Sequence, residues 1–433
     1  MSDFTKLGDY ELSKLEITSH NGFKQSVITL ASSIQIYEDL FSSSITARIT
    51  ILDDTGLMNY LPVIGQEKVD IQFKTRGGDT QISLNMVIHK ISSVSNENLA
   101  QSYNLELVTE DMISNFETRI SEHFEGSATE IAQKCFERIN SSKTFDVEPS
   151  DDRYDQETGI IIPNMTPMRA INFLCDRAYS ESYKSSSYVF FETTKGYKLK
   201  SIESMAQGEK RNEFFLGDLK NTGSGAPDAF LDPNSENKKV ITYSFNSNFS
   251  VLDNIAKGMY VGNLTTVDMV TRNTKTFTHS YWDDSTDYQY MNDGPIQDVS
   301  GQGRQYRPES YYLLPEVELT AGKPLYNQEK IFLSRMFYKQ LMENIKCTIT
   351  VYGDSDLVTG DCLELNVPLF SSTDPDKKDE YYSGKYIIFA LRHRIQGGRY
   401  IMDLELVKDS FNEALPSPVP QLVGPAGYGG GGR

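Results

Sequence analysis

YNLELVTED at residues 103–111 and YIMDLELVKD at residues 400–409 share a Leu-Glu-Leu-Val core with an acidic residue close behind it. Two further pairs of segments keep the same order along the chain. Gly65 with EKVDIQF (67–73) parallels Gly360 with DCLELNV (361–367), and NMVIHKIS (85–92) parallels KYIIFALR (385–392). One pair of short apolar segments would be a chance likeness, but three pairs in one order predict a reused structural unit.

EKVDIQF and DCLELNV alternate apolar and polar residues, which is typical of strands with one buried face. SITARITILDD (44–54) reads as such a strand, and the RGGD turn at 76–79 joins two more into a hairpin. Near the end, CTITV (347–351) alternates, and Gly397 with Gly398 joins two strands. Antiparallel sheet is therefore expected at both ends of the chain.

The middle of the chain has helical signals. Ser127 and Glu130 stand at capping-box spacing, and Thr166 with Pro167 predicts a second helix start. A strand pair around the turn at Lys195 and Gly196 follows, and QEKIFLSRMFYKQLMEN (328–344) predicts a later helix.

These patterns predict a mixed α+β, mainly β fold with two duplicated antiparallel tube-like β-barrel domains and α/β inserts. The expected ranges are 1–111 for the first tube-like barrel domain, 112–240 for an α/β insert domain, and 241–283 with 345–410 for the second barrel. Residues 284–344 form an insertion with a helix, and 411–433 a Pro/Gly-rich flexible tail.

Composition excludes several classes of protein. The formal charge of -18 over 433 residues argues against tight nucleic-acid binding, which needs clustered Lys and Arg. The sequence has no run of 18 apolar residues, so membrane insertion is not expected. The first twenty residues do not resemble a sorting signal. Four cysteines without CxxC spacing are expected to be buried free thiols: Cys135, Cys175, Cys347 and Cys362.

No constellation of residues predicts catalysis, a metal or a cofactor. The five histidines are scattered: His20, His89, His123, His279 and His393. The acidic pairs are interpreted as turn formers: Asp53/Asp54, Asp151/Asp152 and Asp283/Asp284. DSDLVTGD (354–361) has its glycine at the wrong place for an EF-hand, and GPAGYGGGG near the end lacks the strand and helix of a phosphate loop.

The sequence resembles the baseplate hub proteins of contractile-tailed bacteriophages, which are related to the hub half of type VI secretion spike proteins. The stretches that carry the resemblance are SIQIYEDLFSSSITARITILDDTGLMNYLPVIGQEKVDIQFKT, IIPNMTPMRAINFLCDRAYS with SSYVFFETTKGY, and GDCLELNVP through SGKYIIFALRHRI to YIMDLELVKDS. Together they touch most of the chain up to about 410.

The resemblance implies a structural protein of the virion tail, assembled in the host cytoplasm. Its homotrimer would form a pseudo-sixfold ring between the sixfold tail tube and a trimeric central spike. Partners would be a further copy of the chain, the spike, the tail tube protein, the tape measure protein and other baseplate proteins, and the ring would pass the tape measure and DNA. No spike repeat follows residue 410, so a separate spike chain is expected.

The sequence leaves two questions open. The polar faces of the strands, such as Asp70 with Gln72 and Glu364 with Asn366, face either a lumen or the outside. The alternative function is a baseplate-associated peptidoglycan hydrolase or glycan-binding module, which needs a carboxylate dyad in an aromatic cleft. Trp282 is the one tryptophan available to such a cleft.

Overall fold

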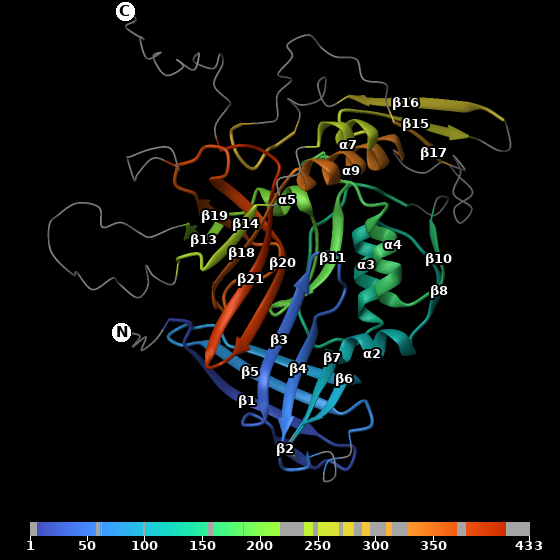
Figure 1. Ribbon diagram of the computed structural model, residues 1–433. Helices are drawn as coiled ribbons and strands as arrows, with labels where there is room; N and C mark the ends of the chain where they lie inside the picture. The colour runs from blue at the N-terminus through green and yellow to red at the C-terminus, as the bar shows by residue number, and fades with distance from the viewer. Residues whose placement is uncertain are drawn as a thin grey trace, which may run out of the picture.

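A computed structural model describes residues 7–57, 61, 63–97, 100–154, 159–184, 186–216, 238–245, 250–267, 272–280, 288–294, 309–313, 328–369 and 378–412. Its main feature is a 13-stranded, mostly antiparallel sheet to which both ends of the described chain contribute (Figure 1). The prediction of a mainly β fold with antiparallel sheets is confirmed.

The first β unit, as we call strands β1 to β7, has the order β3-β4-β7-β6-β5-β1-β2. Alternating burial gives β4, β5 and β7 one core face, as the sequence pattern predicted. The bounds are β1 Tyr10–Thr18, β2 Lys24–Ser26, β3 Ala31–Asp39, β4 Thr46–Asp53, β5 Lys68–Thr75, β6 Ile82–Glu97 and β7 Ala100–Thr109.

The second β unit consists of β13, β14 and β18 to β21, and it continues the same sheet. β20 pairs with β3 of the first unit, and the path runs outward through β21 and β18 to β14, while β19 pairs with β20 and with β13. The bounds are β13 Lys210–Phe215, β14 Thr242–Phe245, β18 Ile345–Tyr352, β19 Cys362–Asn366, β20 Gly384–Gln396 and β21 Arg399–Lys408.

The two units share the pairing order of four strands. β4-β7-β6-β5 in the first corresponds to β18-β21-β20-β19 in the second. Both also shift register at the same place, between Ile88 and Lys90 of β6 and between Ile388 and Ala390 of β20. Because a bulge inserts an extra residue and bends its strand, the two strands bend at corresponding positions.

A side-chain hydrogen bond recurs as well. Thr50 of β4 donates to Asn104 Oδ1 of β7 at 2.9 Å, and Thr350 of β18 donates to Asp403 Oδ1 of β21 at 2.8 Å. In each unit the donating threonine directly follows a buried isoleucine, Ile49 or Ile349.

The turn that enters β5 or β19 corrects one detail of the sequence alignment. The backbone O of Ile88 accepts from Gln66 N at 2.7 Å, and that of Ile388 accepts from Gly360 N at 2.9 Å. Gln66 and Gly360 also share a positive φ, of 72° and 87°. Gln66 rather than Gly65 therefore corresponds to Gly360. The sequence comparison missed this shift of one residue because it matched the two glycines, Gly65 and Gly360, with each other.

Two features differ from the expectation of duplicated barrels. The strand pairings of the described residues form an open path from β14 to β2, so a closed, tube-like barrel is not confirmed. The outer neighbours also differ, since β1 pairs antiparallel with β5 whereas β13 pairs parallel with β19.

The α/β part lies beside the sheet (Figure 1). Its own core packs α3 and α4 against two small sheets, β8 with β10 and β11 with β12 and β9. The bounds are α2 Glu110–Glu117, β8 Ile120–Phe124, α3 Ala128–Glu137, β9 Phe145–Val147, β10 Ile160–Met165, α4 Pro167–Cys175, β11 Tyr188–Thr193, β12 Gly196–Ser201 and α5 Ile202–Ala206.

The caps of these helices follow the sequence signals in part. The capping box between Ser127 and Glu130 is present at the start of α3, and Pro167 begins α4. Thr166 stands at the cap position of α4, but its side chain makes no capping hydrogen bond there. Pro167 suits the first position of the helix even without this hydrogen bond, because its φ is fixed near the helical value and it has no N–H to satisfy.

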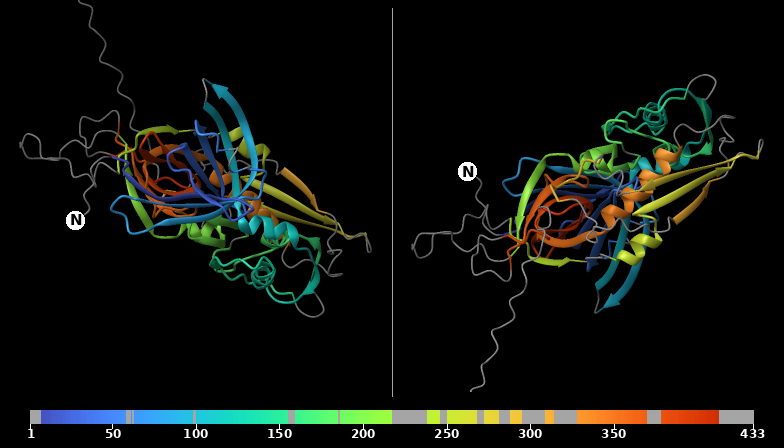
Figure 2. Two further views of the ribbon diagram at one scale, coloured as in Figure 1. Left: turned by 90° about the horizontal axis from the view of Figure 1, so that it is seen from below. Right: turned by 90° about the horizontal axis from the view of Figure 1, so that it is seen from above.

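A third group of elements lies at one end of the sheet. α7 Val251–Ala256 and α9 Gln328–Glu343 accompany a separate sheet of β15 Val261–Val267, β16 Thr274–Ser280 and β17 Glu309–Leu313, which extends away from the main sheet (Figure 2). The predicted helix at 328–344 is confirmed. Of the described strands in 241–283, only β14 joins the second β unit, because alternation identifies a strand but not its neighbour. The Pro/Gly-rich tail expected at 411–433 lies, beyond residue 412, outside the described residues.

Candidate functional site

The junction between the two β units contains a buried charged group. Glu38 of β3 and His393 of β20 are both fully enclosed, with Oε1 of the carboxylate 3.7 Å from Nε2 of the ring. The other ring nitrogen, Nδ1, is 2.7 Å from the hydroxyl of Tyr400. The sequence pattern assigned His393 to a strand. In the structure it lies on β20, and its side chain is buried in the core.

Glu38 also binds two loops outside its own strand. Its carboxylate accepts hydrogen bonds from the backbone N–H of Thr194 at 2.8 Å and of Thr359 at 3.0 Å. Burial raises the pKa of Glu38, but the His393 ring and the two N–H donors outweigh that effect and hold it below its ordinary value. One carboxylate thus joins the first β unit, the α/β part and the second β unit.

A second buried glutamate plays a similar part. Glu192 of β11 accepts from Ile45 N at 2.8 Å and from Thr109 Oγ1 at 3.0 Å, and it pairs with Lys143. Burial raises the pKa of Glu192, and Lys143 opposes that rise. Because Ile45 directly precedes β4 and Thr109 ends the neighbouring strand β7, Glu192 fixes the α/β part to the sheet.

Besides β2 and β13, which also end the sheet, the main sheet has open strand edges at β6 and β14. β6 pairs with β5 only as far as Val87, and among the described residues its outer part pairs with β7 alone. This part of the β6–β7 hairpin projects from the sheet (Figure 2). β14, at the end of the path, pairs with β18 on one side. Val94 on β6 and Tyr243 on β14 are 56% and 47% exposed.

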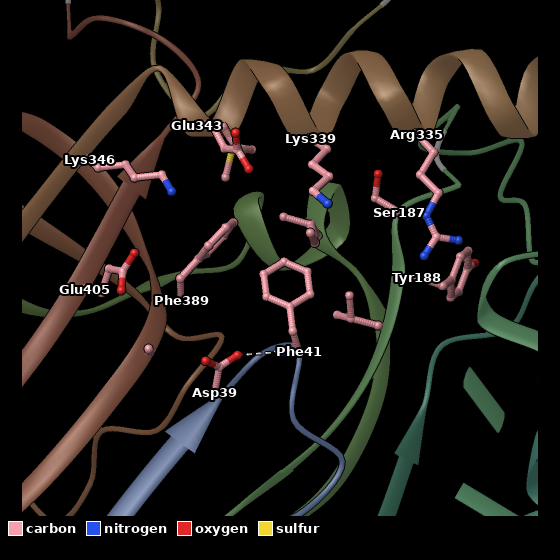
Figure 3. A pocket seen from close by; sticks show the side chains of 14 residues that line it. Asp39, Phe41, Ser187, Tyr188, Arg335, Lys339, Glu343, Lys346, Phe389 and Glu405 are labelled. Atoms are coloured by element: carbon pink, nitrogen blue, oxygen red, sulfur yellow. Dashed lines mark hydrogen bonds between the residues drawn. The ribbon is translucent and has the colours of Figure 1, made fainter. Parts of the chain in front are cut away.

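Beside the junction, a pocket of about 410 Å³ lies between α9, β3, β11 and β20. Phe41, which is 61% exposed, projects into it and meets Phe389 edge-on with ring centroids 5.8 Å apart. Arg335 and Lys339 reach down from α9, and Asp39 stands at the opposite side (Figure 3). The pocket combines an apolar floor with the two cations and one carboxylate, Glu343, of α9.

The structure does not bring the residues singled out from the sequence into one site. Of the histidines, His20, His89 and His123 are exposed, His279 packs on Phe337 of α9, and His393 is in the core. Among the described residues, no group of three or more His, Cys, Asp or Glu side chains is arranged to hold a metal ion.

The interpretation of the acidic pairs as turn formers holds for Asp53, whereas Asp151 and Asp152 join segments that are distant in sequence. Asp152 accepts from Ala128 N at 2.7 Å at the start of α3, and Asp53 accepts from Thr55 N at 3.0 Å. Asp354 of the DSDLVTGD segment accepts from Asn212 at 3.0 Å. Asp283, Asp284 and Trp282, on which the alternative glycan site depended, lie outside the described residues.

The polar strand faces form ion pairs with neighbouring strands. Asp70 pairs with Lys14 at 2.6 Å, and Glu364 pairs with Lys210 at 2.6 Å. Gln72 is half-buried, whereas Asn366 is buried and donates to Glu213. All four cysteines are buried and free, as predicted. No helix of the described part of the chain combines the length and apolar character of a membrane span.

Comparison with known proteins gives the fold. No family model and no curated protein sequence matches the chain. A tail protein from Neisseria meningitidis MC58 is similar in structure, with a TM-score of 0.54 at 9% identity over 93% of this chain and 97% of that one. The 43 kDa tail protein of prophage MuSo2 from Shewanella oneidensis has a TM-score of 0.54 at 11% identity over 92% and 99%. The predicted resemblance to phage tail proteins is confirmed for the fold.

Proposed function

We propose that this chain is a structural baseplate hub of a contractile phage tail, a homotrimer whose six β units form a pseudo-sixfold ring. The two β units of each chain are then two copies of one ancestral unit. The shared strand order, the bulges after Ile88 and Ile388, and the repeated Thr–Asn and Thr–Asp hydrogen bonds support this duplication.

The observation that carries the proposal is the junction of the two units within one chain. There the outer part of β20 pairs with β3, from Ala390 opposite Asp39 to Gln396 opposite Ser33. By the correspondence of the units, β6 is the counterpart of β20, because each carries the bulge. β14 is the counterpart of β3, because β14 pairs with β18 as β3 pairs with β4.

Both counterpart strands have an open edge. The outer part of β6 has no second neighbour among the described residues, and β14 ends the sheet. If the junction recurs between chains, β6 of one copy pairs with β14 of the next. Such pairing completes the hydrogen bonds of both edges and covers Val94 and Tyr243.

A contact of this kind joins two different surfaces, so it is head-to-tail and produces a ring when the rotation closes. Three copies place six similar units around the axis, which suits a sixfold tube on one side and a trimeric spike on the other. The formal charge of -18 lets DNA pass without tight binding. In this role the chain also contacts the tape measure protein and other baseplate proteins of the virion, and it needs no catalytic group or cofactor.

The test is a mixing experiment with edge variants, followed by light scattering and native mass spectrometry. The parent chain is expected to be a trimer, whereas Val94→Asp and Tyr243→Asp, each blocking one edge, are expected to be monomers. Mixed together, they should form a one-to-one dimer, because each retains the edge that the other lacks. Phe23→Asp, at an exposed site beside β2, is the matched control and stays trimeric.

Two outcomes would overturn the proposal. One is a parent chain that stays monomeric at all concentrations tested, alone and with the tail's spike protein. The other is a mixture of the two edge variants that shows no dimer, since a head-to-tail contact requires it.

A further inference from the structure

We propose that the pocket under α9 is a docking site for a peptide segment of another protein, one that presents an apolar side chain beside a single carboxylate. The pocket is independent of the strand edges, since it lies at the loop after β3 and is walled by α9 and β20. Its volume of about 410 Å³ is in the range of sites that hold a few side chains.

The apolar part of the argument rests on Phe41. An aromatic ring that is 61% exposed is costly in water, and here it stands over a floor of buried groups that includes Phe389 and Met342. Figure 3 shows the Phe41 ring directed into the space under α9 rather than along the surface. An apolar side chain inserted between Phe41 and Phe389 would remove the exposed ring from water and complete the packing.

The charged side chains that α9 contributes to the pocket indicate the charge of the ligand. Lys339 is exposed and directed toward Phe41 (Figure 3), and no ion pair joins it to an acid of the described chain. Arg335, one turn away, already pairs with Asp176 at 2.6 Å. The ammonium group of Lys339 is thus available to a carboxylate beside the apolar floor, in a molecule whose formal charge of -18 otherwise disfavours anions.

The opposite wall limits the number of negative charges. Asp39 and Glu405 line the pocket there, and Glu343 of α9 and Lys346 line it as well, so the three acids balance the three cations and would repel a second anionic group. The site therefore favours a monoanionic segment over a phosphate chain or an acidic run. A peptide meets both requirements when an aromatic or aliphatic residue is adjacent to an Asp or Glu.

The probe is a random heptapeptide display library selected against the full-length parent chain. Enriched peptides are synthesised with a fluorescent label, and their affinity is measured by anisotropy. We expect enrichment of an aromatic or aliphatic residue within two positions of an Asp or Glu. Phe41→Ala and Lys339→Ala are each expected to weaken binding at least tenfold, and replacing the peptide carboxylate by an amide to weaken it similarly.

The controls are Phe23→Ala and Lys24→Ala, which remove an exposed phenylalanine and an exposed lysine far from α9. They should leave affinity within twofold of the parent, and circular dichroism should show all four variants folded. The proposal is overturned if no peptide is enriched or if enriched peptides bind the Phe41→Ala and Lys339→Ala variants as tightly as the parent. It is also overturned if binding does not depend on the carboxylate.

Discussion

Glu38 Oε1 lies 3.7 Å from His393 Nε2 across the junction where the two β units meet, and neither side chain is reached by solvent. The two residues are 355 positions apart in sequence. Because the same carboxylate accepts the backbone N–H of Thr194 and of Thr359, three separate segments depend on it.

Glu38→Ala is expected to destabilise the protein by about 3 to 5 kcal/mol, because it leaves two buried N–H groups without their acceptor and removes the carboxylate that faces the buried ring of His393. The free energy of unfolding from urea titration is the measurement. Glu11→Ala is the matched control, since Glu11 is exposed and its ion pair with Lys74 at 3.4 Å contributes about 0 to 1 kcal/mol. Equal losses in the two variants would mean that Glu38 does not hold the junction.

The same group makes part of the stability depend on pH. The pKa of Glu38 in the folded protein lies below its ordinary value of 4.5. The folded state therefore binds this proton less readily than the unfolded chain does, and the resulting stability is present above pH 4.5 and is lost as pH falls through the folded pKa.

Comparing the parent with Glu38→Gln isolates this contribution from the other carboxylates. The difference in unfolding free energy between the two chains should be constant just above pH 4.5 and shrink below it. Urea titrations at several pH values measure this difference. A difference that grows on acidification would contradict the lowered pKa.

The cysteines give a prediction about reactivity. Burial raises the pKa of Cys135, Cys175 and Cys347 to about 12, and that of Cys362 to about 11. Because the thiolate is the reactive form, none of the four should react with iodoacetamide at pH 8 in the folded protein. Mass spectrometry should find four adducts after unfolding in urea. Fast labelling of a native thiol would show that its segment opens locally.

Local sequence patterns account for the part of the fold that could be predicted. Alternation predicted which residues of β4 and β5 face the core, because burial on one face of a strand is a local pattern. The capping box at Ser127 was likewise predictable, since its partner is three residues away. Both signals are contained in a short window.

What the sequence did not reveal depends on distant partners. Nothing near Glu38 or His393 indicates that they meet, and the parallel pairing of β13 with β19 has no local signal. The sequences of β15 and β16 resemble those of strands in the main sheet, but the two strands pair with each other, and β15 also pairs with β17. The pocket also escaped prediction, because Phe41, Lys339 and Phe389 come from three separate segments.

The proposed duplication predicts a stabilising hydrogen bond at each of two matched positions. Thr50→Val and Thr350→Val each remove one hydroxyl donor while keeping the shape of the side chain. Thr50→Val is expected to cost about 0.5 to 1.5 kcal/mol, and Thr350→Val about 1.5 to 3 kcal/mol because its acceptor is a carboxylate. In double-mutant cycles with Asn104→Ala and Asp403→Ala respectively, both coupling energies should be stabilising, with the larger one at Thr350. Thr46→Val, at an exposed position of β4, should change little. A coupling at one site and none at the other would mean that the two hydrogen bonds have different environments, and the likeness of the units would then be confined to their backbones.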